Sequence, residues 1–125
     1  MSAPLILLVS SDPNAETAVR SAVASSRREV RQLGSDYGAM AVIQAELREA
    51  ALAFVDLDPG LHGHELCRAA AHHMPVIALT SEAGPAVEET ARECGASGCL
   101  HKPLDPEQVR SLLDQTLGVE APVEL

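Results

Sequence analysis

Residues 5–13 read Leu-Ile-Leu-Leu-Val-Ser-Ser-Asp-Pro. Five consecutive apolar residues are typical of a β-strand buried on both faces, as in a parallel sheet that is covered by helices on both sides. Asp12 and Pro13 then predict a helix start, because aspartate caps helix N-termini and proline fits the first helical position. This stretch therefore predicts a strand that leads directly into a helix.

The same alternation continues along the 125-residue chain, whose length fits one domain. Apolar runs predict further strands at 52–55 and 75–79, and shorter strands are predicted at 30–33 and 98–101. Helical spacing predicts helices at 13–23, 37–50, 64–73, 86–94 and 105–117. Strands joined by crossover helices form a parallel sheet. The sequence thus predicts a doubly wound α/β domain over residues 4–117 with a five-stranded parallel sheet, and a tail or linker start at 118–125.

Composition narrows the functional classes. The chain has 9 basic and 18 acidic residues, a net charge of −9, and this field would repel a nucleic-acid backbone. Three cysteines without an export signal predict reduced thiols in the cytoplasm, and no apolar run is long enough to span a membrane. We therefore expect a cytoplasmic monomer or weak homodimer that binds another protein or a small ligand.

Polar residues follow the predicted strands at their carboxyl ends, where ligands bind in such sheets. They are Ser10, Ser11 and Asp12 after the first strand, Asp56 and Asp58 after the third, Thr80 after the fourth and Lys102 after the fifth. Asp56 would be the nucleophile that forms an aspartyl phosphate, Thr80 a hydrogen-bond donor and Lys102 the counter-charge. Lys102 is the only lysine in the chain. These residue types predict a site for one phosphoryl group.

Four motifs at these strand ends resemble the receiver domain of response regulators in bacterial two-component signalling. They are Leu-Leu-Val before the first turn, Phe-Val-Asp56 with a Pro-Gly-x-x-Gly loop, Pro-Val-Ile-Ala-Leu-Thr80, and Gly-Ala-Ser-Gly-x-x-x-Lys102-Pro103. The resemblance covers residues 4–117 and implies the (βα)5 flavodoxin-like receiver fold. It also implies phosphorylation of Asp56 by a histidine kinase, Mg²⁺ as a cofactor, and signalling by contact with a protein partner.

The residues after the first strand depart from the receiver pattern. Receivers carry an acidic pair there that holds Mg²⁺, whereas this chain has Ser10 and Ser11, and hydroxyls are poor Mg²⁺ ligands. Asp12 stands one residue later and is expected to cap the helix, so it is only a weak metal candidate. We therefore expect a metal-free site in which Asp56 faces Lys102 with neutral serines beside them.

Two further departures concern the loop after Asp56 and the route to the output surface. Pro59 stands three residues after Asp56, whereas receivers usually have a proline four residues after the acceptor. Asp58 and Asp56 are weak metal candidates, but we expect Asp58 to point to solvent. Receivers usually carry an aromatic residue three positions before the lysine, and that position is Cys99. Phosphorylation would therefore lack its usual route to the output surface.

These residues predict a divergent receiver, or pseudo-receiver, that acts by protein–protein contact with weak or absent Mg²⁺-dependent phosphorylation. We expect no enzyme activity beyond self-phosphorylation on Asp56. The alternative is a working receiver that takes phosphate on Asp56 from a histidine kinase, with Asp58 or Asp12 rescuing the metal. An ordinary strand-end carboxylate at Asp56 is a weaker alternative. A zinc site is weaker still, because no Cys-x-x-Cys or His-x-x-x-His pair is present.

Overall fold

The computed structural model describes residues 4–24, 28–34, 42–44, 50–58, 63–82 and 84–118. The strands are β1 (Leu5–Val9), β2 (Glu29–Leu33), β3 (Leu52–Asp56), β4 (Val76–Thr80) and β5 (Gly98–His101), and the bounded helices are α1 (Pro13–Val23), α3 (Gly63–Ala71), α4 (Pro85–Glu93) and α5 (Pro106–Leu117). Of the helix predicted at 37–50, residues 42–44 are helical and Ala50 is not. The rest of that helix and residues 119–125 lie outside the described residues.

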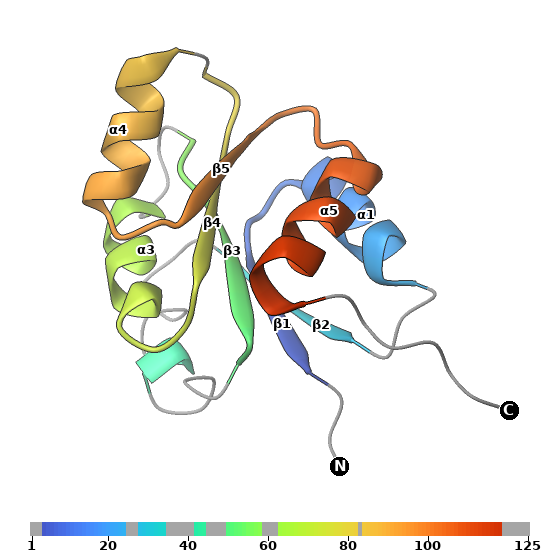
Figure 1. The fold of residues 1–125 in the computed structure, drawn as a ribbon. Helices are drawn as coiled ribbons and strands as arrows, with labels where there is room; N and C mark the ends of the chain where they lie inside the picture. Colours follow the sequence, from blue (N-terminus) through green and yellow to red (C-terminus); the bar gives the residue numbers. More distant parts are fainter. Residues whose placement is uncertain are drawn as a thin grey trace, which may run out of the picture.

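All neighbouring strands are parallel, in the order β2-β1-β3-β4-β5. This confirms the predicted doubly wound sheet. The chain passes from β1 to β2 on one side and then returns to β3 on the other, so the strand order reverses between β1 and β3 (Figure 1). Ligands of such sheets bind beyond the carboxyl ends of the strands at this reversal. The ends of β1 and β3 therefore mark the expected position of a site.

Helices cover both faces of the sheet, with α1 and α5 on one face and α3 and α4 on the other (Figure 1). Successive strand residues point to opposite faces, so each strand contributes to two cores. In β1, Leu7 and Val9 belong to the core that includes Cys67 of α3. Ile6 and Leu8 belong to the core beneath α1 and α5. None of the helices in the described part of the chain is long and apolar enough to cross a membrane.

Capping residues set the start of α1 as predicted. The Oδ1 atom of Asp12 accepts a hydrogen bond of 2.9 Å from the N–H of Asn14, and Pro13 is the first residue of the helix.

The prediction for the end of α3 is wrong by two residues. The helix ends at Ala71, and residues 72–73 form a turn instead of the last helical turn, because the chain reverses there to enter β4.

Candidate functional site

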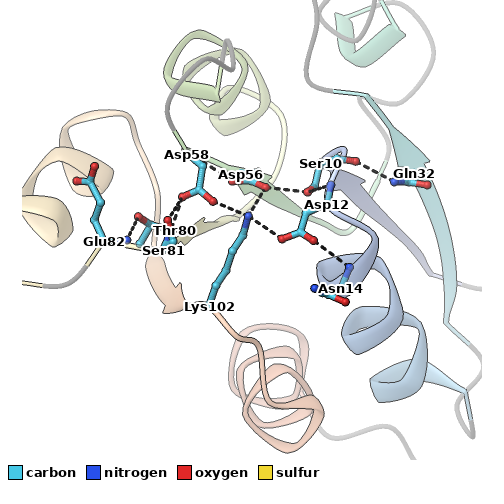
Figure 2. A network of polar contacts seen from close by, with 10 residues as sticks. All are labelled: Ser10, Asp12, Asn14, Gln32, Asp56, Asp58, Thr80, Ser81, Glu82 and Lys102. Carbon is cyan, nitrogen blue, oxygen red and sulfur yellow. Dashed lines mark hydrogen bonds and ion pairs between the residues drawn. The ribbon is translucent and has the colours of Figure 1, made fainter.

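A polar cluster lies at the carboxyl edge of the sheet, where β1, β3, β4 and β5 end (Figure 2). We call it the Lys102 cluster, and its members are Ser10, Asp12, Asp56, Asp58, Ser81 and Lys102. Strand pairing explains the contact between the ends of β1 and β3. Val9 pairs with Val55, so Ser10 and Asp56, the next residue of each strand segment, are neighbours. The sheet therefore brings together the residues that the sequence placed at separate strand ends.

The ammonium group of Lys102 lies at the centre of this cluster (Figure 2). Its Nζ is 2.7 Å from Asp56 Oδ2, 2.6 Å from Asp58 Oδ2 and 3.0 Å from Asp12 Oδ2, and 12% of the lysine side chain is exposed. Burial by itself lowers the pKa of Lys102, but hydrogen bonds to the three carboxylates outweigh it and raise the pKa above its usual value. Lys102 is therefore charged at neutral pH and is the counter-ion of all three aspartates.

Asp56 is 1% exposed, and both of its carboxylate oxygens accept hydrogen bonds. Oδ2 accepts from Ser10 Oγ at 2.8 Å and from Lys102 Nζ at 2.7 Å, and Oδ1 accepts from the backbone N–H of Asp58 at 3.0 Å. Gly63 lies so close to the backbone of Asp56 that a Cβ atom at Gly63 would collide with the Asp56 carbonyl oxygen. The Asp56 carboxylate is thus enclosed by hydrogen-bond donors, and it is the acceptor in all three of its hydrogen bonds.

Ser10 stands at an acidic position of the receiver pattern and is fully buried. Its hydroxyl donates to Asp56 and accepts a hydrogen bond of 3.0 Å from the N–H of Asp12. Its carbonyl oxygen accepts a hydrogen bond of 2.8 Å from Gln32 Nε2 on β2. Ser11, in contrast, is exposed. Only one of the two serines therefore joins the cluster, and it does so as a neutral hydrogen-bonding group.

The expectation that Asp58 points to solvent is wrong. Its Oδ2 binds Lys102, and its Oδ1 accepts hydrogen bonds from Ser81, at 2.8 Å from the N–H and 3.1 Å from the hydroxyl. The physical reason is local: the Asp58 N–H donates to Asp56 Oδ1, which turns the residue back toward the strand end. Asp12 caps α1 as expected and also pairs with Lys102. Neutral serines are therefore not the only neighbours of the Asp56 and Lys102 pair.

Lys102 lowers the pKa of both flanking aspartates. For Asp12, the hydrogen bond from Lys102 is the largest cause and holds the pKa below its usual range against the opposing effect of burial. For Asp58, burial raises the pKa, but hydrogen bonds from Lys102 and Ser81 outweigh burial and leave the pKa below its usual range. Both aspartates therefore carry a negative charge at neutral pH.

Thr80 lies beside the cluster and is 2% exposed. Among the residues described, its Oγ1 contacts the N–H of Glu82, from which it accepts a hydrogen bond of 3.0 Å, and not Asp56. Its carbonyl oxygen accepts a hydrogen bond of 2.7 Å from the N–H of Lys102. The backbone carbonyl of Thr80 thus helps to position Lys102, and the Thr80 hydroxyl holds the N–H of Glu82 just after β4.

The contacts that Ser81 and Gly63 make in the site were not predicted from the sequence. Ser81 is a second hydroxyl residue directly after Thr80, and this was the available signal for its contact with Asp58. Gly63 is the last glycine of the Pro-Gly-x-x-Gly motif, and the need for a residue without a side chain follows from its approach to the Asp56 backbone. Both contacts depend on tertiary packing, which the spacing of residues in the sequence does not encode.

A zinc site would need cysteine or histidine ligands. Cys67 is fully buried, and burial raises the pKa of its thiol to about 12. Burial, together with the negative charge of Glu88, raises the pKa of Cys99 as well. Within the described ranges, no three side chains of His, Cys, Asp or Glu are arranged to hold a metal ion. The three aspartates of the cluster are directed at Lys102 instead.

Comparisons with known proteins agree with the fold. A sequence model of the response regulator receiver domain matches residues 6–114. A solved structure of a response regulator from Thermotoga maritima is similar with a TM-score of 0.80 and 18% identity, covering 94% of this chain and 99% of that chain. A response regulator receiver protein from Burkholderia phymatum is similar with a TM-score of 0.78 and 27% identity, covering 96% and 99%. No curated protein sequence matches the chain.

Proposed function

The chain belongs to the response regulator receiver domain family, and from this premise we propose that it is a divergent receiver with weak or absent Mg²⁺-dependent phosphorylation. It acts through contact with a protein partner, either a histidine kinase or a downstream signalling protein. Asp56 is its candidate phospho-acceptor, and Lys102 and Thr80 are the candidate groups that hold the phosphoryl oxygens. The observation that carries the proposal is the enclosure of Asp56 by hydrogen-bond donors.

The enclosure limits how Asp56 reaches a phosphoryl donor. A carboxylate oxygen that accepts two hydrogen bonds has used both lone pairs, and Oδ2 already accepts from Ser10 and Lys102. Oδ1 accepts one hydrogen bond, from Asp58, and is the oxygen left for nucleophilic attack. Because only 1% of Asp56 is exposed, a donor must displace part of the cluster to reach this atom.

The chemical step itself needs Lys102. Oδ1 of Asp56 would attack phosphorus, and the bond from phosphorus to the leaving group would break as the new P–O bond forms. The leaving group departs with the electron pair, as the imidazole of a kinase phosphohistidine or as acetate from acetyl phosphate. Lys102 would offset the negative charge on the phosphoryl oxygens. The same ammonium already binds three carboxylates, so it would have to give up at least one of them.

A Mg²⁺ ion would need the same oxygen atoms as Lys102. Mg²⁺ prefers anionic oxygen ligands in a near-octahedral arrangement, and Ser10 offers a hydroxyl that is already hydrogen-bonded to Asp56 and Asp12. The Nζ of Lys102 lies among the three carboxylates of the cluster. The residues present therefore do not fit Mg²⁺ while Lys102 holds this position.

The second candidate is a working receiver, and one observation favours it. Asp12 and Asp58 each direct a carboxylate oxygen into the cluster, although neither stands at an acidic position of the receiver pattern. If Lys102 moved away, these two carboxylates and that of Asp56 would offer anionic ligands to a divalent cation. In that case Asp56 would accept phosphate from a histidine kinase in a Mg²⁺-dependent reaction.

Intact-mass spectrometry after incubation with acetyl phosphate separates the two candidates. Wild-type protein and the Asp56→Ala variant are incubated with and without Mg²⁺. We expect little or no phosphoryl adduct on wild-type protein under either condition. The matched control is Asp105→Ala, because Asp105 is a helix-capping aspartate outside the cluster. An adduct that requires both Mg²⁺ and Asp56, and that persists in the control, would overturn the proposal and establish the working receiver.

A further inference from the structure

Asp58 binds donors from two segments that follow different strands (Figure 2). Its Oδ2 is 2.6 Å from the Nζ of Lys102, which follows β5. Its Oδ1 accepts both hydrogen bonds from Ser81, which follows β4. The side chain is 19% exposed, so these contacts are partly shielded from water. One carboxylate thus connects an ammonium, an N–H and a hydroxyl from separate parts of the chain.

We propose that Asp58 is an internal tether, which holds Ser81 and Lys102 in the unphosphorylated protein and competes for the donors that a phosphoryl group on Asp56 would use. The inference rests on the proposed function, in which Asp56 and Lys102 form the phosphoryl site. Asp58 is in direct contact with the phospho-acceptor, because its backbone N–H donates a hydrogen bond to Asp56 Oδ1, the oxygen left for attack. The tether is therefore a positioning residue that lies against the reacting carboxylate.

Competition follows from the number of donors. An ammonium group has three N–H donors, and Lys102 directs them at three carboxylates. A carboxylate and a phosphoryl group offer the same chemistry to such donors, because both are anions that accept short, charge-assisted hydrogen bonds. A phosphoryl group on Asp56 would therefore take Lys102 only by displacing a carboxylate. Asp58 is the one that also binds Ser81, so its displacement would release both segments together.

Loss of the tether should have a local effect. The N–H of Glu82 donates to Thr80 Oγ1, and this hydrogen bond is independent of Asp58. The N–H of Lys102 donates to the Thr80 carbonyl oxygen and keeps the start of the following segment on the sheet. Removal of the Asp58 carboxylate is therefore expected to release Ser81 while β4 and β5 stay paired.

Amide hydrogen exchange measured by NMR tests the tether in protein treated with EDTA and without a phosphodonor. In the Asp58→Ala variant, we expect the Ser81 amide to exchange roughly tenfold faster than in wild type, because a hydrogen bond to a charged acceptor is lost. Asp58→Asn keeps an oxygen acceptor and should give a smaller increase. The amide of Ala78 within β4 is the internal reference, and Asp105→Ala should leave Ser81 exchange unchanged.

Two outcomes would overturn the tether. One is unchanged Ser81 exchange in both Asp58 variants while the Ala78 amide stays protected. The other applies where wild type gives a weak but measurable adduct with acetyl phosphate: an adduct no larger in Asp58→Asn than in wild type, since release of Lys102 should increase it several-fold. The exchange measurement uses unphosphorylated, metal-free protein. A Mg²⁺-dependent adduct on wild type would therefore overturn the proposed function and leave the exchange result for the tether intact.

Discussion

Receivers usually carry acidic residues after the first strand and an aromatic residue on the fifth, and this chain departs from both patterns. At the carboxyl edge of the sheet, Ser10 and Ser11 replace the acidic pair. Carboxylates of Asp12 and Asp58 nevertheless lie within 3.0 Å of the Lys102 Nζ. The lost negative charge is therefore supplied from neighbouring positions.

The α4–β5 surface shows no such replacement. Cys99 takes the aromatic position, and a hollow of about 190 Å³ lies beside it between α4 and β5. A second hollow, of about 420 Å³, borders the same cysteine on the side of α5. A buried ammonium without carboxylate partners would strongly destabilise the fold, whereas a hollow open to water costs little. The two regions should therefore respond very differently to substitution.

Lys102→Met should have the largest effect. It removes the cation that binds all three aspartates and leaves their charges facing one another. Removal of one partner from a buried ion pair costs several kcal/mol, and partial exposure of Asp12 and Asp58 reduces this to about 3 kcal/mol. Urea unfolding measures the loss. The matched control is Arg20→Met, which breaks the exposed pair with Glu16 and should cost less than about 0.5 kcal/mol.

The pH dependence of the same unfolding free energy gives an independent check on this pairing. Asp12 and Asp58 have pKa values below their usual value of 3.8, so their stabilisation is present above that value and is lost as pH falls through the lower folded pKa. Lys102 has a raised pKa, so its stabilisation is lost only as pH rises above 10.5. Lys102→Met should weaken both dependences, and identical pH profiles for the two proteins would contradict the pairing.

Asp56→Asn should have the next largest effect, about 2 kcal/mol, because it leaves a buried donor unsatisfied. The Asp56 carboxylate only accepts hydrogen bonds: one from the Ser10 hydroxyl, one from Lys102 Nζ and one from the Asp58 N–H. An amide has only one acceptor oxygen, so its NH₂ group must face a donor in either orientation. Urea unfolding again provides the measurement. An unchanged free energy of unfolding would show that Asp56 is not held by these donors.

The sequence predicted the central strands β1, β3 and β4 well because they consist mainly of apolar residues and are buried on both faces. It also placed Asp56 and Lys102 correctly, since the ends of parallel strands meet at one edge. The direction of the Asp58 side chain was not predictable in this way. It depends on the hydrogen bond from its own N–H to Asp56 and on the approach of Ser81 from another strand. Such contacts belong to the tertiary structure and leave no periodic signal in the sequence.

Restoring the acidic pair should have a smaller, metal-dependent effect. The double variant Ser10→Asp, Ser11→Asp adds one carboxylate beside Asp56 and a second one at the adjoining exposed position, and it is expected to bind Mg²⁺ more tightly than wild type. Binding to the folded state stabilises it by about 1.4 kcal/mol when Mg²⁺ is present at ten times its dissociation constant. Thermal unfolding with and without Mg²⁺ measures this gain. Ser21→Asp adds a carboxylate on the exposed face of α1 and should show none.

Cys99→Phe should have the smallest effect, within about 0.5 kcal/mol, because the ring can occupy the adjoining hollow without displacing its neighbours. Cys67→Phe is the matched substitution at a cysteine with no exposed surface, and overpacking there should cost about 1–3 kcal/mol. Urea unfolding of both variants measures the difference. A large loss in Cys99→Phe would mean that the α4–β5 surface is packed as tightly as the core. Folding would then require a small side chain at residue 99, in the same way as it requires the carboxylates around Lys102.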